Sequence, residues 1–234
     1  MQKVYVIILN YKKWQDTAEC LESLLCSSYT NFHAVVIDNA SGNNSLENLI
    51  EWANSDSLYS TFSTDFSDIA VKPVSYTHIT DKDLAAINLN TLPTITFIQN
   101  SENNGFARGL NPTLALLKNE NAYIWLLNPD VTVEKTTMEE LVQFTRLNQQ
   151  KTIIGAVIRF YEHPEKIHLY GGGKINYLSA TVGLINDPQA ISKLDYIAGG
   201  CLFTHTDTFY QLGLLPEDYF LYWEETDFCY NAKR

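Results

Sequence analysis

The sequence predicts an α/β fold, with a mixed sheet flanked by helices, a parallel N-terminal half and antiparallel additions. Residues 4–9 and 34–37 are unbroken, largely β-branched apolar runs, as in strands buried on both faces of a parallel sheet. Each run is followed by a helical pattern, which gives the order β-α-β-α. The chain has 234 residues, which is enough for one large α/β domain.

The N-terminal half is predicted to alternate helices and strands. Residues 16–25 carry apolar residues at helical spacing, with an acid in the first turn, and residues 46–53 repeat the pattern after the second strand. Residues 55–92 instead combine Ser, Thr, Asp and scattered aromatic residues without a clear period. We expect an insertion or a long mobile loop at 55–92, within a single domain that spans residues 1–234.

Regular structure is predicted again from residue 94, in the order strand, helix, strand, helix and strand, at 94–99, 113–118, 123–127, 134–148 and 153–161. Antiparallel elements then follow. Residues 167–185 predict a hairpin or meander that turns at the glycines 171–173, and residues 196–204 predict a strand interrupted by Gly199 and Gly200. A last helix begins near residue 224 and has no end signal, so we expect the chain to lack a C-terminal part.

The charge balance restricts the partners of the protein. Sixteen Lys and Arg residues against 27 Asp and Glu residues give a net charge of −11. Because this charge repels nucleic-acid phosphates and anionic lipids, we expect no nucleic-acid partner. The sequence has no run of about 18 apolar residues, so no transmembrane segment is expected. The four cysteines lack CxxC spacing, which is typical of reduced thiols and predicts a cytoplasmic location.

Polar residues stand at the ends of three predicted strands: Asn10, Asp38, and then Asn128 with Asp130. Because the carboxyl ends of parallel strands meet at one edge of a sheet, these side chains are expected to line one crevice. Each could alternatively cap a helix or shape a turn. Asp130 is the candidate metal ligand, since Mg²⁺ and Mn²⁺ take few protein ligands and complete their shell with phosphates and water.

A glycine-containing segment at 105–109 follows the strand at 94–99. Gly105 and Gly109 permit close backbone approach, and Arg108 offers donors for a phosphate or a carbonyl group. The spacing is neither GxGxxG after the first strand nor the GxxxxGKS/T pattern. The segment therefore argues against a Rossmann dinucleotide site and against a P-loop.

Three acids near the C-terminal end, Glu224, Glu225 and Asp227, form the candidate catalytic group. Neighbouring carboxylates raise one another's pKa, and in a partly dry cleft one of them can take a proton from a hydroxyl. The alternative is that they only stabilise a helix N-terminus. The aromatic residues just before them favour sugar binding, because aromatic faces suit sugar rings: Tyr219, Phe220, Tyr222 and Trp223.

Taken together, these segments resemble the family 2 glycosyltransferases, the inverting group with a GT-A fold, and in particular their bacterial rhamnosyltransferase-like branch. The resemblance implies a GT-A-type, Rossmann-like mixed sheet. The matching segments occur in the family's order along nearly the whole chain: VIILNY at 6–11, VIDNAS at 36–41, NNGFARGLN at 103–111, WLLNPD at 125–130, GGC at 199–201 and YWEETD at 222–227.

The resemblance implies how the donor would be held. Asp38 would accept a hydrogen bond from the imide of a pyrimidine base. Asn128 and Asp130 stand at the family's DxD motif, and Asp130 would bind the Mg²⁺ or Mn²⁺ that bridges the diphosphate. The nucleotide-binding residues it implies are Asn10, Tyr11, Asp38, Asn104, Arg108 and Asn128.

The resemblance also implies the catalytic base. Glu225 stands where the family has its base, with Glu224 and Asp227 as substitutes. The base would take the proton of an acceptor hydroxyl as this hydroxyl attacks the anomeric carbon. One such displacement inverts the stereocentre.

The function implied is that of a metal-dependent hexosyltransferase in surface polysaccharide synthesis. It would move a sugar, for which rhamnose is one candidate, from a dTDP- or UDP-linked donor to a glycan or lipid-linked acceptor, in the cytoplasm or at the inner face of the membrane. The alternative is a non-catalytic nucleotide-sugar binding module of a polysaccharide assembly system, suggested by Asn128 in place of an acid. A nucleotidyltransferase is disfavoured, because residues 10–13 contain no glycine.

Overall fold

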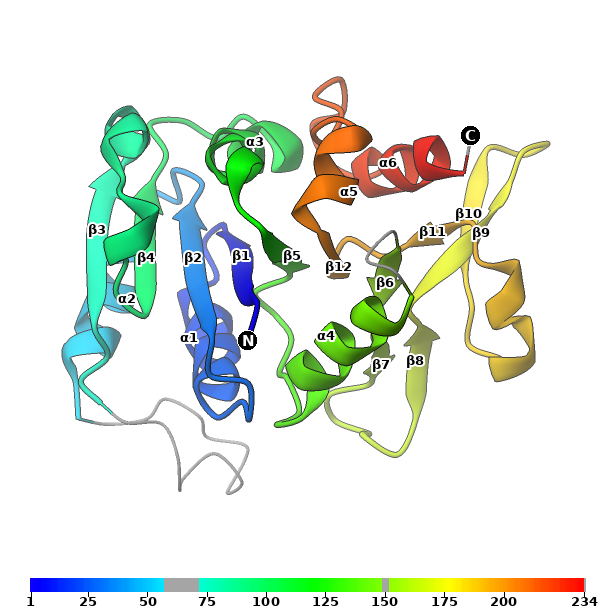
Figure 1. Ribbon diagram of the computed structural model, residues 1–234, viewed down its shortest axis with the longest axis horizontal. Helices are drawn as coiled ribbons and strands as arrows, with labels where there is room; N and C mark the ends of the chain where they lie inside the picture. The colour runs from blue at the N-terminus through cyan, green and yellow to red at the C-terminus, as the bar shows by residue number, and fades with distance from the viewer. Residues whose placement is uncertain (57–71, 149–151, 234) are drawn as a thin grey trace.

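The computed structural model describes residues 1–56, 72–148 and 152–233, and its centre is a seven-stranded mixed sheet in the order β3-β4-β2-β1-β5-β12-β6 (Figure 1). Strands β3, β4, β2, β1 and β5 run parallel, and β12 is antiparallel to both of its neighbours. The predicted fold class is thereby confirmed. The strands that frame the site are β1 (Lys3–Asn10), β2 (Phe32–Asp38), β4 (Ile95–Gln99), β5 (Ala122–Leu127), β12 (Cys201–His205) and β6 (Ile153–Gly155).

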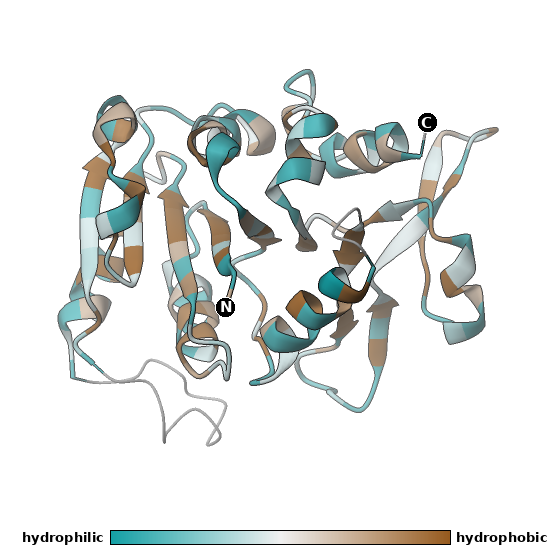
Figure 2. Ribbon diagram, in the orientation of Figure 1, coloured by the Kyte–Doolittle hydropathy of each residue, from teal (hydrophilic) through white to brown (hydrophobic). Residues whose placement is uncertain are grey.

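Helices cover both faces of this sheet, which explains why the central strands are apolar throughout. Along β1, Val4, Val6 and Ile8 pack with the helices of one face, while Tyr5 and Ile7 pack with those of the other. Each such buried side chain contributes about 1.5–3 kcal/mol. Figure 2 shows the hydrophobic residues concentrated in these strands. The first face holds α1 (Trp14–Leu25), α2 (Ser45–Asn54) and α4 (Thr137–Leu147), and the second α3 (Phe106–Leu116), α5 (Thr206–Gln211) and α6 (Glu224–Ala232).

The expectation of a structureless segment at 55–92 is wrong for its second half. Residues Tyr76–Thr80 form β3, which pairs in parallel with β4 at the edge of the sheet. The short 3-10 helices Asp81–Ala86 and Leu89–Thr91 follow. An edge strand is half-exposed, so it lacks the continuous apolar run of a central strand. Residues 57–71 lie outside the described residues.

The C-terminal half adds the expected antiparallel strands in two small sheets. The predicted strand at 153–161 is divided, because β6 joins the central sheet while β7 (Val157–Arg159) pairs with β8 (Ile167–Tyr170). A three-stranded sheet contains β9 (Gly172–Asn176), β10 (Thr181–Leu184) and β11 (Tyr196–Ile197), and a 3-10 helix (Pro188–Lys193) lies between the last two.

The glycines 171–173 do not make the predicted turn. Gly172 and Gly173 belong to β9, where a Cβ atom would lie 2.0 Å from the carbonyl oxygen of Tyr196 and 2.4 Å from that of Gly183. Close packing between strands, rather than a reversal of the chain, therefore requires glycine there.

Helix α3 begins at Phe106, seven residues before the predicted start, and continues through Pro112 to Leu116, followed by a 3-10 turn at Leu117–Asn119. All four cysteines are buried. Within the described ranges, no helix has both the length and the apolar character that crossing a bilayer demands.

Candidate active site

Asn10 and Asp38 form a buried pair at the carboxyl ends of β1 and β2, where the strand register sets them side by side. The Asn10 Nδ2 atom donates to Asp38 Oδ1 at 2.7 Å. The Ser41 hydroxyl donates to the same oxygen at 2.5 Å, and the Ser41 amide donates to Asp38 Oδ2 at 3.1 Å. The strand-end pattern thus identified two residues that do meet, and their geometry is fixed by hydrogen bonds before any ligand arrives.

Asn39 links this pair to the loop between β4 and α3. Its Oδ1 accepts from Asn100 Nδ2 at 3.0 Å, and its Nδ2 donates to Asn103 Oδ1 at 2.8 Å and to the Gly105 carbonyl at 3.2 Å. The side chain is buried, so its hydrogen bonds determine the shape of the loop. Sequence analysis did not assign Asn39 a role, although it follows Asp38 within the same matched segment.

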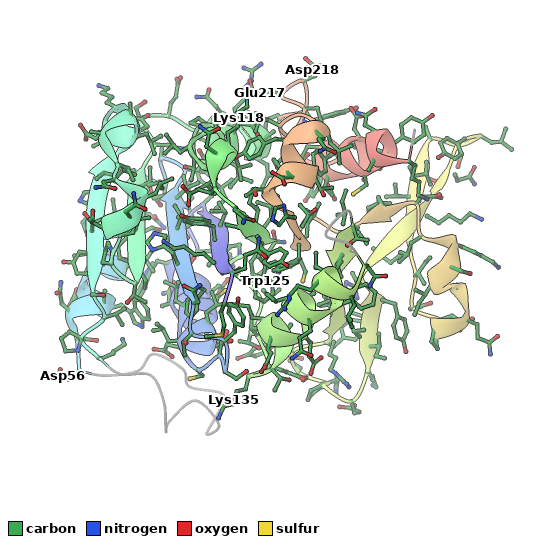
Figure 3. All side chains as sticks on the ribbon, in the orientation of Figure 1. Asp56, Lys118, Trp125, Lys135, Glu217 and Asp218 are labelled. Carbon is green, nitrogen blue, oxygen red and sulfur yellow. The ribbon has the colours of Figure 1, made fainter. Side chains whose placement is uncertain are left out.

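The other expected nucleotide-binding residues are more scattered. Tyr11 is exposed, and hydrogen bonds from Lys12 and then Asn103 lower the pKa of its hydroxyl, which places it against the β4–α3 loop. Asn104 is exposed and donates to Glu102 within its own loop at 3.0 Å. Arg108 lies 3.8 Å from Glu217 of the α5–α6 loop, and Figure 3 labels that residue near the loop's tip. The structure therefore joins Tyr11 to the β4–α3 loop and gives Asn104 and Arg108 other partners.

A second group gathers at the turn made by Gly199 and Gly200. The backbone N–H of Asn128 donates to the Gly200 carbonyl at 3.2 Å, because β12 runs antiparallel to β5. A Cβ atom on Gly200 would lie 3.0 Å from Asn128 Nδ2, and one on Gly199 would lie 3.4 Å from the carboxyl carbon of Glu225. The two glycines thus allow Asn128 and Glu225 to approach one turn from different elements.

Glu225 is the second residue of α6, and its carboxylate interacts with the start of that helix. Burial raises the pKa of Glu225, and this effect is opposed by hydrogen bonds from its own amide and from the amides of Gly199 and Thr226. A carboxylate that is partly removed from water yet oriented by amides suits a general base.

Glu224, the first residue of α6, has a different environment. Its side chain is buried, and Oε2 has no hydrogen-bond partner among the described residues. Burial, with a smaller contribution from the charge of Glu225, raises the pKa of Glu224 to about 6. The two neighbouring carboxyls are therefore distinguished by their surroundings.

Asp227 is held by local contacts. It accepts from the Tyr219 hydroxyl at 3.4 Å and from Asn231 Nδ2 at 3.3 Å. Tyr219 precedes α6 and Asn231 lies in its last turn, so Asp227 has the environment of a structural acid more than that of a base.

Asp130 is exposed in the turn after β5. It lies close enough to α1 that its charge adds to burial in raising the pKa of Cys20. Among the described residues, no three His, Cys, Asp or Glu side chains gather to hold a metal ion. One carboxylate nevertheless fits Mg²⁺ or Mn²⁺, because these ions take most of their ligands from substrate phosphates and water.

The strand order relates the two groups to each other. Because β1 lies between β2 and β5, the Asn10–Asp38 pair and the Asn128–Asp130 turn follow three adjacent parallel strands at one edge of the sheet. The arrows of β2 and β3 in Figure 1 point to the side of the molecule where α3 and the α5–α6 loop lie. A cavity of about 440 Å³ lined by Met1, Tyr29 and Arg146 lies instead near the amino end of β1 and contains no candidate residue.

Known proteins that are similar to this chain are glycosyltransferases. No protein-family model matches the chain. The chain is 25% identical over 146 residues to the "Low-salt glycan biosynthesis hexosyltransferase Agl10" of Haloferax volcanii, a match that covers 60% of this chain and 47% of that protein. The chain is thus homologous to glycosyltransferases, and it spans about half the length of this relative.

Solved structures with the same fold are also glycosyltransferases. The mannosyltransferase PcManGT from Pyrobaculum calidifontis, in complex with GDP-Man and Mn²⁺, has a TM-score of 0.57 at 15% identity, covering 93% of this chain and 48% of its own. TarS 1–349 from S. aureus with UDP has a TM-score of 0.60 at 14% identity, covering 98% and 54%. GalNAc-T7 with UDP, GalNAc and Mn²⁺ has a TM-score of 0.67 at 15% identity, covering 99% and 40%. The fold is therefore that of the GT-A glycosyltransferases.

Proposed function

We propose that this chain is an inverting glycosyltransferase domain of family 2 that moves a sugar from a nucleoside-diphosphate donor to a glycan or lipid-linked acceptor. The observation that carries the proposal is the meeting of Asn128 and Glu225 at the Gly199–Gly200 turn. Their sheet edge also holds the Asn10–Asp38 pair. A nucleotide-binding edge beside a partly desolvated carboxylate is the combination that sugar transfer needs.

The donor side of the proposal rests on Asp38. Its Oδ2 accepts one hydrogen bond, from the Ser41 amide, and a carboxylate oxygen has a second lone pair for the imide N–H of a uracil or thymine base. We therefore favour UDP- or dTDP-linked donors, with rhamnose as one candidate sugar. The solved structures named above hold UDP or GDP-Man, which supports a nucleotide at this edge.

The metal side rests on Asp130, with Asn128 two residues before it. These side chains would hold Mg²⁺ or Mn²⁺ together with the diphosphate of the donor. The ion, when bound, supplies Lewis-acid stabilisation of the departing diphosphate. Mn²⁺ in the PcManGT and GalNAc-T7 complexes supports this part of the proposal.

The chemistry rests on Glu225. Its carboxylate would take the proton of an acceptor hydroxyl while the hydroxyl oxygen forms a bond to the anomeric carbon. The bond from that carbon to the diphosphate oxygen breaks on the opposite face, and the configuration inverts. The amides of Gly199 and Thr226 orient the carboxylate for this step. A reducing, cytoplasmic setting is supported by the four buried cysteines, which form no disulfide among the described residues.

A non-catalytic nucleotide-sugar binding module is the second candidate. The observation in its favour is the side-chain amide of Asn128, which lies at the Gly199–Gly200 turn. Asn128 stands where the family's motif has an acid. Such a module would bind donor without consuming it. Release of sugar from the donor in the presence of Mn²⁺ therefore separates the two functions.

The test combines thermal unfolding with donor hydrolysis. A nucleotide at about 100 times its Kd stabilises a native protein by about 2.7 kcal/mol. At this chain length that corresponds to a rise of roughly 5–10 °C in Tm. We expect this rise with UDP or dTDP plus Mn²⁺, together with slow hydrolysis of the matching nucleotide sugar. The absence of any rise with UDP, dTDP or GDP would contradict nucleotide binding, and a rise without hydrolysis would favour the binding module.

A further inference from the structure

The loop that leads into α6 exposes a continuous apolar run. Phe220, Leu221, Tyr222 and Trp223 are 63, 50, 71 and 37% exposed. We refer to residues 220–223 as the apolar loop. Contiguous large apolar side chains in water are unfavourable, and on a folded protein they mark a binding surface. This run ends one residue before Glu224 and two before Glu225.

The apolar loop is held in place by Gly105 and Phe106, at the start of α3. The Phe106 amide donates to the Phe220 carbonyl at 2.9 Å, and a Cβ atom on Gly105 would lie 2.1 Å from that carbonyl oxygen. Tyr222 and Trp223 have φ angles of 69° and 79°, which bulky residues rarely adopt. The surrounding contacts therefore impose the conformation that directs these side chains outward.

The charge around the apolar loop limits what it can bind. Residues 217–227 contain five acids and no Lys or Arg. Figure 3 labels two of these acids, Glu217 and Asp218, at the outer end of the α5–α6 loop. Arg108 balances Glu217, and the other four acids repel phosphates, uronic acids and anionic lipid headgroups. An uncharged ligand with apolar faces and hydroxyl groups is compatible with both the aromatic rings and the acids.

We propose that Tyr222 and Trp223, supported by Phe220, form an acceptor subsite that stacks on the ring of an uncharged sugar. This inference rests on the proposed function, and it specifies the acceptor: its terminal residue is a neutral sugar, and any charged lipid carrier group lies away from the apolar loop. A ring stacked on Trp223 has its hydroxyls beside the helix start that carries Glu225, the proposed base. The acceptor is thus positioned by the residues that directly precede the base.

Tryptophan fluorescence tests the binding step directly. Trp52 and Trp125 are 0 and 1% exposed, so in a Trp14→Phe background acrylamide quenching reports on Trp223. We expect methyl glycosides of glucose, galactose, mannose or rhamnose to protect Trp223 from quenching. Methyl glucuronide and glucose 6-phosphate should need at least tenfold higher concentrations. Protection by no neutral glycoside, or preference for an anionic one, would overturn the proposal.

Variants test the same subsite in the transfer reaction, with the methyl glycosides as acceptors. Trp223→Gly removes the ring at a φ angle that suits glycine, and Tyr222→Ala removes its neighbour. Each should raise the acceptor KM at least fivefold while the donor KM changes less than twofold. The matched control is Phe144→Ala, which removes a side chain that is 53% exposed on α4 and should leave both constants unchanged. An acceptor KM equal to that of the control would overturn the subsite.

Two further outcomes distinguish the sugar subsite from a membrane contact and from the proposed function on which it rests. Wild-type protein that sediments with phosphatidylglycerol vesicles, with sedimentation lost in Trp223→Gly, would replace the sugar subsite by a membrane contact. A wild-type protein that hydrolyses its donor while no neutral glycoside protects Trp223 would refute the subsite and leave the proposed function standing. If the nucleotides fail to bind, the proposed function fails, and the fluorescence titration still decides whether the loop binds a sugar.

Discussion

At the scale of single residues, the candidate site depends on two adjacent carboxyls with different surroundings. Glu225 receives hydrogen bonds from backbone amides of α6 and of Gly199, and these hydrogen bonds favour its charged form. Glu224 is buried with one oxygen unpartnered among the described residues, and this environment favours its neutral form. Burial raises the pKa of both carboxyls, but only Glu225 also receives hydrogen bonds from the amides of Gly199 and Thr226, which makes it the candidate for the base.

Glu225→Gln tests the assignment of the base. The substitution keeps the size of the side chain and removes its ability to take a proton. Because general-base catalysis contributes about 10²–10⁴-fold, we expect kcat to fall by at least about 100-fold. Nucleotide affinity should stay within twofold, as measured by calorimetry. Asp227→Asn is the control, since Tyr219 and Asn231 already occupy that carboxylate. Loss of kcat in Asp227→Asn alone would move the base there.

The pKa of Glu224 predicts a pH-dependent stability. Burial raises the pKa of this carboxyl from 4.5 to about 6, so the folded state binds more protons than the unfolded state between these values. Its contribution to the free energy of unfolding therefore falls as pH rises through this window, by up to about 2 kcal/mol. Glu224→Gln removes this loss. In urea unfolding, the variant should gain stability relative to wild type between pH 4 and pH 7.5. An equal difference at both pH values would contradict the assignment.

At the scale of elements, the contact between Gly105 and Phe220 joins the start of α3 to the loop that precedes α6. Gly105 has a φ angle of 87°, and the backbone of residue 220 occupies the space a side chain would need. Asn111 strengthens the same connection, because its amide donates to the Leu215 carbonyl at 2.9 Å and accepts from the Leu215 amide at 3.2 Å. The elements proposed to hold the donor and the acceptor are therefore packed as one unit.

Gly105→Ala should be more damaging than an ordinary glycine substitution. Gly42 is the matched control, because it has a φ angle of 65° but nothing within 4 Å of a built Cβ atom. Gly42→Ala should cost about 1 kcal/mol for the left-handed backbone. Gly105→Ala adds a clash with the Phe220 carbonyl, which costs about 1–3 kcal/mol more. Urea unfolding measures the stability of both variants. Equal losses of stability would contradict the clash, because the backbone of Phe220 would then move away from the new side chain at little cost.

The strands that the sequence predicted most closely are those whose burial is uniform. Strands β1, β2 and β5 are buried on both faces and read as apolar runs, whereas the half-exposed β3 gives no such pattern. The same limit applies to the site. Asn10 and Asp38 end adjacent strands and could be paired from the order of elements. The roles of Asn39 and Gly105 depend on segments distant in sequence, and a glycine required by close packing has the same letter as one required by a turn.

At the scale of the whole molecule, the proposed function requires a chain with a net charge of −11 to bind an anionic donor. Arg108 lies 3.8 Å from Glu217, so this carboxylate balances part of its charge. The proposed metal would then supply the positive charge that the surface lacks. Nucleotide affinity should consequently depend on a divalent ion more steeply than in a basic protein.

Asp130→Asn tests this dependence against a variant with the same change in net charge. Mn²⁺ should raise the affinity of wild-type protein for UDP or dTDP at least tenfold in calorimetric titrations. Asp130→Asn should abolish most of that gain, because the ion loses its carboxylate ligand. Asp56→Asn changes the global charge equally, but Figure 3 labels Asp56 at the end of the molecule opposite the α5–α6 loop, so the gain should persist. Equal losses in both variants would attribute the effect of Mn²⁺ to screening of the net charge, and Asp130 would then have no role as a ligand.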